Sequence, residues 1–401
     1  MSAREGAVQI ADVYKSGVLA AQLRRYRDRT EFEYLPSYLD GGAAVATTLP
    51  LTREVTVLPP GAVPAFFAGL LPEGRRLTAL RQLVKTSADD EFSLIEAVGR
   101  DPVGDVQVVA EGDAPVTLEP LVSVSQSFGE VRFSDIMGRA GIVDRVGIAG
   151  VQEKASAGMI SLPVSQAGHQ YLLKIDPPEY PFAVDNEAYF IELSRRCAIA
   201  TVHAEVVVDA QGRHGLLVRR FDRVIDPDGT PRRRAVEDAC QLLNLWPADK
   251  YNTTAEEVLR AIARVCPAAP VALRDAFRQL VFAWLTGDGD VHAKNLSVVS
   301  EPGGEWRLAP AYDLPSTMVY GDLTMALPIG GRRDGLTRAH WMEFAREVGL
   351  AARAAQRVLD ELLEATASLG DDLLAGVLPF DQNTTSDWVK RLRYRHRQLR
   401  R

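Results

Sequence analysis

The stretch Asp290-Val291-His292-Ala293-Lys294-Asn295, followed by Tyr312-Asp313, is the most informative part of this chain. It contains an acid, an amide five residues later, and a second acid after a short predicted strand. This is the polar set that phosphoryl transfer from Mg-ATP requires, because one carboxylate can orient the attacking hydroxyl while the amide and the other carboxylate hold the metal. The pattern therefore predicts Asp290 as a catalytic base and Asn295 and Asp313 as ligands of Mg²⁺.

The context strengthens this interpretation. Asp290 and Asn295 have the spacing of the catalytic-loop Asp and Asn of protein kinases. That spacing alone is a weak signal. Here, however, the apolar run Phe282–Leu285 precedes the pair and the strand-like run Leu296–Val299 follows it, so the polar residues are expected in a loop between two buried elements.

Other interpretations of the same residues remain open. Asp288 competes with Asp290 for the role of base, although it lies seven residues from Asn295 and is ranked lower. Residues 287–290 can also be a plain polar loop, with Asn295 as a cap of a helix or strand. His292 can contact phosphate or brace Asp290, but a structural histidine is the more frequent case.

Lys174 lies in the apolar, strand-like run Tyr-Leu-Leu-Lys-Ile. A lysine in a buried strand needs a counter-charge, and Glu187 lies early in the next predicted helix, which Asp185 and Asn186 are expected to open as N-caps. In kinases such a strand lysine pairs with a helix glutamate and positions the α/β-phosphates. The alternative is an edge-strand lysine that points to water.

The segment 147–154, Gly-Ile-Ala-Gly-Val-Gln-Glu-Lys, precedes the strand-rich region. Its two glycines allow the backbone to approach phosphates, and successive N–H groups can cradle an anion. It is not a Walker A motif, because Lys154 does not follow a glycine and no Ser or Thr comes next. By itself the signal is weak, since a plain turn is the commoner explanation.

Composition is typical of a folded soluble protein, and 401 residues predict two or three domains. No apolar run reaches the roughly 18 residues of a membrane span, and we find no signal-peptide pattern. The odd number of cysteines, in apolar surroundings, favours a reducing compartment and predicts a cytoplasmic protein. The six histidines lack zinc-ligand spacing, and the net charge of −7 gives no overall attraction to nucleic acid.

Hydrophobic periodicity divides the chain into three predicted domains, residues 1–115, 116–235 and 236–401. The first combines a small sheet with helices, the second is mainly strands, and the third is mainly helical. The predicted fold class is α+β, a two-lobed protein-kinase-like fold with a small N-terminal α/β module. Expected strands are 8–14, 30–34, 155–163, 170–175, 203–209, 215–221, 296–299 and 306–308; expected helices are 64–71, 75–85, 92–98, one from 185, and one from Glu237-Asp238.

At these residues the chain resembles the HipA family, the serine/threonine kinase toxins of bacterial type II toxin–antitoxin systems. The resemblance covers nearly the whole chain, and its motifs occur in the family's order. The matching segments are 66–73, 99–104, 149–154, 171–174, 184–187, 220–223, 237–241, 292–295 and 311–313.

The resemblance implies a role for each matched position. Ala149, Gly150, Val151, Gln152, Glu153 and Lys154 would form the phosphate loop. Lys174 would be the ATP lysine, with Glu187 beside it. Asp290 would be the catalytic acidic residue, and Asn295 and Asp313 would bind Mg²⁺. The remaining predicted ATP-binding residues are Arg219, Arg220 and Phe221 at the hinge, together with His292 and Tyr312.

The resemblance also implies partners. Such proteins phosphorylate a protein substrate, an aminoacyl-tRNA synthetase in the best-known branch, and thereby arrest translation and growth. A small helix-turn-helix antitoxin binds the toxin, and the complex represses its own operon on DNA. No membrane partner is expected.

Two positions depart from the family pattern. The family has a serine at the start of the phosphate loop whose autophosphorylation switches the kinase off, whereas this chain has Gly147 there, and Ser156 lies further along. Arg219 stands where an acid is common, so adenine contacts at this position would come mainly from the backbone.

Two alternative functions and two interpretations of the basic C-terminal segment remain from the sequence. The chain can be a catalytically weak co-repressor that clamps an antitoxin on DNA, or a kinase of small molecules. The basic end, residues 390–397, can be a solvated helix face or can touch DNA phosphates.

Overall fold

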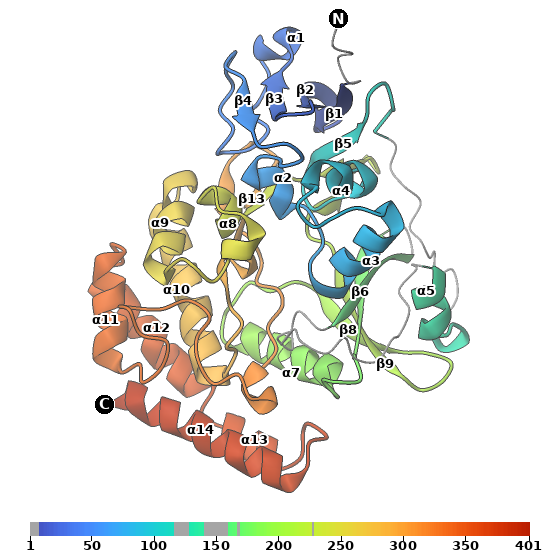
Figure 1. Ribbon diagram of the computed structural model, residues 1–401. Coiled ribbons are helices and arrows are strands. Elements are labelled where there is room, and N and C mark those ends of the chain that lie inside the picture. Colours follow the sequence, from blue (N-terminus) through green and yellow to red (C-terminus); the bar gives the residue numbers. More distant parts are fainter. Residues whose placement is uncertain (1–7, 116–127, 140–158, 167–168, 227) are drawn as a thin grey trace, which may run out of the picture.

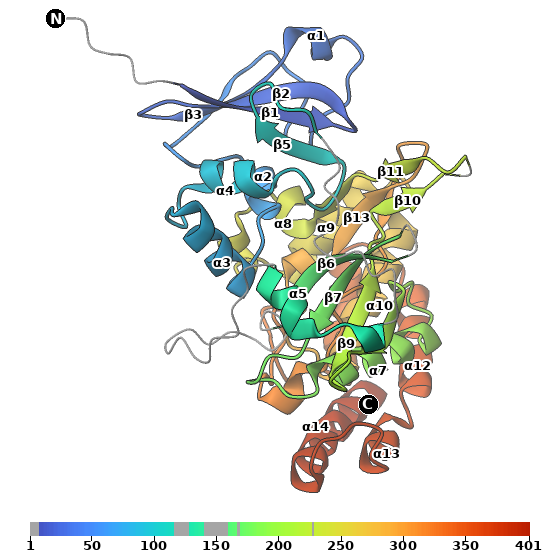
Figure 2. The ribbon, with the colours of Figure 1, turned by 90° about the vertical axis from the view of Figure 1, so that its right-hand side faces the viewer.

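The computed structural model describes residues 8–115, 128–139, 159–166, 169–226 and 228–401. Within them, a five-stranded sheet, a four-stranded sheet and a mainly helical region follow one another along the chain (Figure 1). Figure 2 shows the five-stranded sheet at one end of the molecule and the C-terminal helices at the other. This is the predicted α+β arrangement of two lobes and an N-terminal module. None of the described helices is long and apolar enough to cross a bilayer.

The N-terminal sheet is antiparallel, with the strand order β4-β3-β2-β1-β5. In β3 the alternation seen in the sequence buries Thr30, Phe32 and Tyr34. Phe67 and Phe92, from two helices on the same side, close this core. The expected strands and helices here are confirmed, and β2, β4 and β5 complete the sheet. The elements are β1 (Gln9–Lys15), β2 (Val18–Arg25), β3 (Thr30–Tyr34), α1 (Pro36–Leu39), β4 (Thr56–Leu58), α2 (Ala65–Gly69), α3 (Gly74–Val84), α4 (Glu91–Val98) and β5 (Val106–Ala110).

The four-stranded sheet is also antiparallel and has the order β6-β7-β9-β8. Lys174 lies on β7, paired with Ser161 on one side and Leu216 on the other, so the edge-strand alternative is wrong. The predicted hairpin is β8 and β9. The elements are η1 (Phe128–Glu130), α5 (Phe133–Arg139), β6 (Ile160–Gln166), β7 (His169–Ile175), α7 (Ala183–Arg196), β8 (Ala204–Val208) and β9 (His214–Arg219).

Helix α7 begins at Ala183, two residues before the predicted N-cap. The Asp176 carboxylate accepts the backbone N–H of Val184 at 2.6 Å, and this bond satisfies one of the first free donors of the helix. Asp185 therefore lies in the first turn and Asn186 is completely buried. The expectation that these two residues cap the helix is wrong, because the cap comes from a residue outside it.

The C-terminal region surrounds α10, whose buried Phe277, Phe282 and Trp284 belong to the largest core cluster of the described residues. A three-stranded sheet, β12-β13-β14, packs beside it. The elements are β10 (Arg223–Ile225), β11 (Pro231–Arg233), β12 (Val236–Asp238), α8 (Ala239–Leu242), η2 (Pro247–Asp249), α9 (Ala255–Val265), α10 (Ala269–Thr286), η3 (Ala293–Asn295), β13 (Ser297–Ser300), β14 (Trp306–Leu308), η4 (Thr317–Tyr320), α11 (Arg338–Glu347), α12 (Ala352–Ala365), α13 (Leu369–Leu374) and α14 (Gln382–Arg400).

The prediction that Glu237 and Asp238 begin a helix is confirmed for Asp238 and wrong for Glu237. Both residues lie in β12, which pairs with β13. Asp238 is the N-cap of α8 and accepts the N–H of Gln241 at 2.9 Å, whereas Glu237 accepts two hydrogen bonds from Thr47. Its charge is thus satisfied by the N-terminal module and not by a helix dipole.

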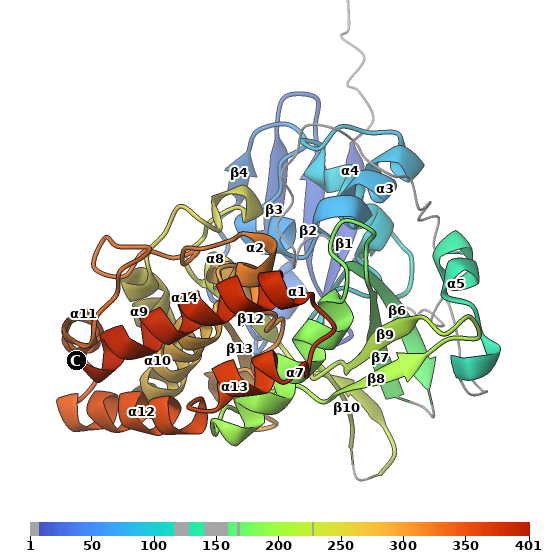
Figure 3. The ribbon, with the colours of Figure 1, turned by 90° about the horizontal axis from the view of Figure 1, so that it is seen from below.

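The basic C-terminal segment is a helix. Figure 3 shows α14 running across the helical region, where Trp388, Leu392 and Leu399 are buried. Arg395 is also buried: its guanidinium lies 3.9 Å from the Trp284 ring centroid and donates to the Trp284 carbonyl at 3.0 Å. At least one basic residue of this helix, Arg395, therefore packs inside the protein and is not a solvated surface residue.

Candidate active site

Lys174 lies at the centre of the candidate site. Its neighbours in β7, Leu173 and Ile175, point into the core on one face of the sheet, so Lys174 must point to the other face. There its ammonium donates to both Glu187 oxygens, at 2.7 and 2.9 Å, and to Asp313 Oδ1 at 3.0 Å. Burial would lower the pKa of Lys174, but the Asp313 and Glu187 carboxylates outweigh it and raise this pKa. The predicted Lys174–Glu187 pair is present.

Asn295 and Asp313 are also side by side. Asn295 Nδ2 donates to Asp313 Oδ2 at 3.0 Å, and Asn295 Oδ1 accepts the backbone N–H of His292 at 3.1 Å. Asp313 adopts a left-handed backbone with φ 58°, a strained conformation that is frequent at functional sites. Amide and carboxylate oxygens are the ligands that Mg²⁺ prefers, so the two side chains fit this ion.

No cluster of three or more His, Cys, Asp or Glu side chains that could hold a metal occurs among the residues placed in the structure. Mg²⁺ usually binds through one or two carboxylates, and substrate phosphates supply further oxygens. The Asn295–Asp313 pair is of this sparse kind.

Asp290 lies in the loop between α10 and η3 and is almost completely buried. Its carboxylate Oδ1 accepts the Tyr251 hydroxyl at 2.9 Å, and its backbone N–H donates to Asp288 Oδ1 at 3.0 Å. Burial, together with the neighbouring acids, raises the pKa of Asp288 well above its usual range. The two acids thus differ in environment, and Asp290 keeps the first rank as base because it has the five-residue spacing from Asn295 and accepts the Tyr251 hydroxyl.

A buried amide joins α7 to the segment after Asp313. Asn186 accepts the backbone N–H of Ser316 at 2.8 Å and donates to its carbonyl at 3.0 Å. The Ser316 hydroxyl in turn donates to the carbonyl of Thr286 at 2.6 Å. The helix that carries Glu187, the segment that carries Asp313 and the loop that carries Asp290 are thus fixed to one another. The sequence shows Asn186 only as a polar residue near a helix start.

The segment predicted to be the hinge places an aromatic pair near this cluster. Phe221 stacks on Tyr312, with ring centroids 5.9 Å apart. The Tyr312 hydroxyl donates to the Lys294 carbonyl at 2.6 Å, which ties the ring to the catalytic loop. Arg219 is exposed at the end of β9 and contacts His169.

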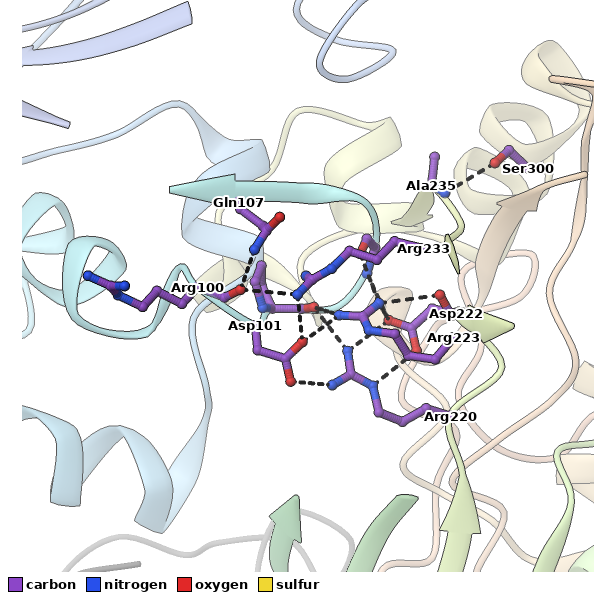
Figure 4. A network of polar contacts seen from close by, with 11 residues as sticks. Arg100, Asp101, Gln107, Arg220, Asp222, Arg223, Arg233, Ala235 and Ser300 are labelled. Carbon is purple, nitrogen blue, oxygen red and sulfur yellow. Dashed lines mark hydrogen bonds and ion pairs between the residues drawn. The ribbon is translucent and has the colours of Figure 1, made fainter. Parts of the chain in front are cut away.

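Arg220 has a different environment. Its guanidinium is buried and bonds Asp222 at 2.9 Å and Asp101 at 2.9 Å, the latter from the N-terminal module (Figure 4). Arg223 joins the same two acids, so the ion pairs that follow β9 are buried. The Arg220 side chain is engaged with the module, and a nucleotide at this position would meet the backbone.

A second contact links the module to the predicted catalytic loop. Lys294 donates to Asp238 and to the carbonyl of Gly69, both at 2.9 Å. Glu73 forms an ion pair with Lys250. The segment after α2 therefore rests against the loop of Asp290. The remaining predicted ATP-binding residues, 149–154, lie outside the described part of the chain, as do Gly147 and Ser156.

The sheets, the helical region and the N-terminal module together define a protein of the kinase-like fold class. The family model described as "HipA-like C-terminal domain" matches residues 146–369, and that of the "HipA N-terminal domain" matches residues 11–109. The chain therefore belongs to the HipA family.

Individual relatives agree with this assignment. Y4mE of Sinorhizobium fredii is 30% identical over 394 residues, which is 90% of each chain. The serine/threonine-protein kinase toxin HipA of Shewanella oneidensis is 27% identical and covers 75% of this chain and 73% of its own. A solved structure of a Shewanella oneidensis HipA, HipB and operator DNA complex matches 97% of both chains, with a TM-score of 0.77 and 20% identity.

Proposed function

We propose that this chain is an ATP- and Mg²⁺-dependent serine/threonine protein kinase. It would act in the cytoplasm as the toxin of a type II toxin–antitoxin system and phosphorylate a translation-related protein such as an aminoacyl-tRNA synthetase. The observation that carries the proposal is the contact of Lys174 with both Glu187 and Asp313, with Asn295 on the other oxygen of Asp313. Family membership supports the kinase class.

In the proposed reaction each side chain has one task. Lys174, held by Glu187, would bind the α/β-phosphates, and Asn295 and Asp313 would hold Mg²⁺, which neutralises phosphate charge when bound. Asp290 would accept the proton of the substrate hydroxyl while the oxygen of that hydroxyl bonds to the γ-phosphorus. The bond from that phosphorus to the β,γ-bridging oxygen breaks, and ADP leaves.

The nucleotide base would lie at the hinge. Phe221 and Tyr312 offer aromatic surface, and the backbone around Arg219 and Arg220 offers polar groups. Residues 149–154 would supply the phosphate loop, and His292 would contact phosphate or brace Asp290. All of these residues belong to the site predicted from the sequence.

The test is transfer of radiolabelled phosphate from ATP to the proteins of a bacterial lysate. We expect the wild-type chain to label a protein on serine or threonine. The matched control is Asp290→Asn, which has the same shape but cannot act as a base. Equal labelling by both proteins would contradict the assignment of the base, and phosphoproteomics of expressing cells would identify the substrate.

A second candidate is a co-repressor that binds a helix-turn-helix antitoxin on DNA. The Shewanella complex of HipA, HipB and operator DNA motivates it, and on α14 Lys390, Arg391, Arg397 and Arg400 are exposed. Calorimetric titration with Mg-ATP separates the two candidates: the kinase should bind nucleotide and consume it, whereas an idle co-repressor should show no turnover.

We also expect that the chain does not inactivate itself through its phosphate loop. Gly147 has no hydroxyl to phosphorylate. After prolonged incubation with ATP, mass spectrometry should find no phosphopeptide spanning residues 145–156 that accumulates as activity falls. Gly147→Ser is the matched variant, and it should gain that phosphopeptide and lose activity with time. Accumulation in the wild-type chain, at Ser156 for example, would contradict the prediction.

A further inference from the structure

Tyr251 lies beside the proposed base, although no motif marks it in the sequence. It follows η2 and precedes α9, 39 residues before Asp290 in the chain. Its hydroxyl donates to Asp290 Oδ1 at 2.9 Å. Its ring stands edge-on to His292, with centroids 5.2 Å apart. One side chain therefore touches two members of the predicted catalytic loop.

We propose that Tyr251 is a positioning residue, which fixes the orientation of the Asp290 carboxylate and keeps it ionised for proton transfer. This inference rests on the proposed kinase function and adds a residue that neither the motifs nor the resemblance includes. A hydrogen bond to a carboxylate stabilises its charged form, and the partner of a catalytic base commonly sets the base's orientation.

The position of Tyr251 is itself well fixed. The backbone N–H of Ala293, in the catalytic loop, donates to the carbonyl of Lys250 at 3.3 Å, and Arg333 donates to the carbonyl of Tyr251 at 3.1 Å. Lys250 is held by its ion pair with Glu73. Segments from the N-terminal module, the catalytic loop and the loop before α11 thus place the phenol against Asp290.

The phenol donates to the Asp290 carboxylate. Burial raises the pKa of Tyr251, and the charge and hydrogen bond of Asp290 raise it further. In this proposal Asp290 takes the proton of the substrate hydroxyl, and Tyr251 remains its hydrogen-bond donor. This separates the two roles: Tyr251 acts through Asp290 and does not itself exchange a proton with the substrate.

The test is Tyr251→Phe, which keeps the ring against His292 and removes only the hydroxyl. We expect kcat/KM for phosphate transfer to fall about 10- to 100-fold, as for loss of a hydrogen bond to a charged group, with ATP affinity by calorimetry unchanged. The acidic limb of the pH profile should move to higher pH, because a carboxylate without its donor holds a proton more tightly. The surrounding charged or titratable groups, Glu73, Lys250, Asp288, His292 and Asp322, are the same in both proteins.

A matched control is Tyr38→Phe, which also loses a hydroxyl: in the N-terminal module this hydroxyl donates to the carbonyl of Ala43 at 3.0 Å and accepts the backbone N–H of Ala43 at 3.3 Å. It should change neither the rate nor the pH profile. An unchanged kcat/KM in Tyr251→Phe would overturn the proposal. A fall in kcat/KM without a shift of the acidic limb of the pH profile would also overturn it, because it would mean that Tyr251 has only a structural role.

A second measurement does not depend on turnover. In protein carrying ¹³C-labelled aspartate, the Asp290 carboxyl resonance is identified by its absence in Asp290→Asn. Its titration midpoint should lie at higher pH in Tyr251→Phe than in the wild type, and an unchanged midpoint would overturn the proposal. If the wild-type chain transfers no phosphate, the proposed function fails, while this midpoint still decides the role of Tyr251.

Discussion

Replacing Asp290 by asparagine is expected to lower the rate of phosphate transfer by a factor of about 10² to 10⁴, the usual contribution of a general base. Asparagine has the same size and retains an oxygen that can accept the Tyr251 hydroxyl, so the loop should keep its shape. It cannot take a proton from the substrate hydroxyl. Initial rates of labelled-phosphate transfer, with ATP affinity measured in parallel, would show a loss in kcat without a matching loss in binding.

Asp288→Asn is the informative comparison, because Asp288 is the other acid of the loop. It is buried, and burial raises its pKa. Asparagine keeps the size of this side chain and can still accept the Asp290 backbone N–H, and Asp288 lies seven residues from Asn295 where the kinase pattern has five. We expect a much smaller loss of transfer than in Asp290→Asn. The reverse order of the two losses would assign the base to Asp288.

Local pattern was sufficient for the parts of the site that lie on regular elements. Lys174 sits in an apolar strand and Glu187 in the helix that follows, so their meeting could be predicted from a short stretch of chain, and it is observed. The Asn295–Asp313 contact was expected for a similar reason, since the strands β13 and β14 bring the two ends of a short segment together.

Contacts between distant segments could not be predicted in this way. Tyr251 meets Asp290 only because the loop before α9 packs on the catalytic loop, and Asn186 meets Ser316 across 130 residues. Glu237 has the sequence appearance of a helix start, yet its partner is Thr47, 190 residues away. In each case a polar side chain has its hydrogen-bond partner in a segment distant in sequence. The residues around such a side chain contain no pattern that identifies this partner.

The junction between the N-terminal module and the hinge shows what such a contact contributes. Asp222 accepts hydrogen bonds from Arg220, from Arg223 and from the backbone N–H of Gly104. Phe221 lies between Arg220 and Asp222 in sequence, so the network holds the Phe221–Tyr312 pair of the predicted hinge to the module. The division of the chain at residues 115 and 235 stays a prediction, but the segments on either side of it are joined by buried charge.

Asp222→Asn is therefore expected to destabilise the protein by about 3 kcal/mol at neutral pH, because breaking a buried ion pair leaves arginine charge uncompensated. Burial would raise the pKa of Asp222, but Arg220 and Arg223 outweigh it and lower this pKa to about 2. The unfolded pKa is near 3.9, so the carboxylate contributes stability above about pH 4 that is lost as the pH falls toward 2.

The Asp222→Asn variant should therefore differ from the wild type in the pH dependence of its free energy of unfolding as well as in its stability at neutral pH. Across the same acidic window the wild type should lose about 2 kcal/mol through Asp222, and the variant should lack that contribution. Urea unfolding between pH 2 and pH 7 measures both. Asp226→Asn is the control, because its pair with Arg232 is partly exposed and should be worth less than about 1 kcal/mol. Equal destabilisation by the two variants, or parallel pH curves for Asp222→Asn and the wild type, would show that the junction charge does not hold the module to the hinge.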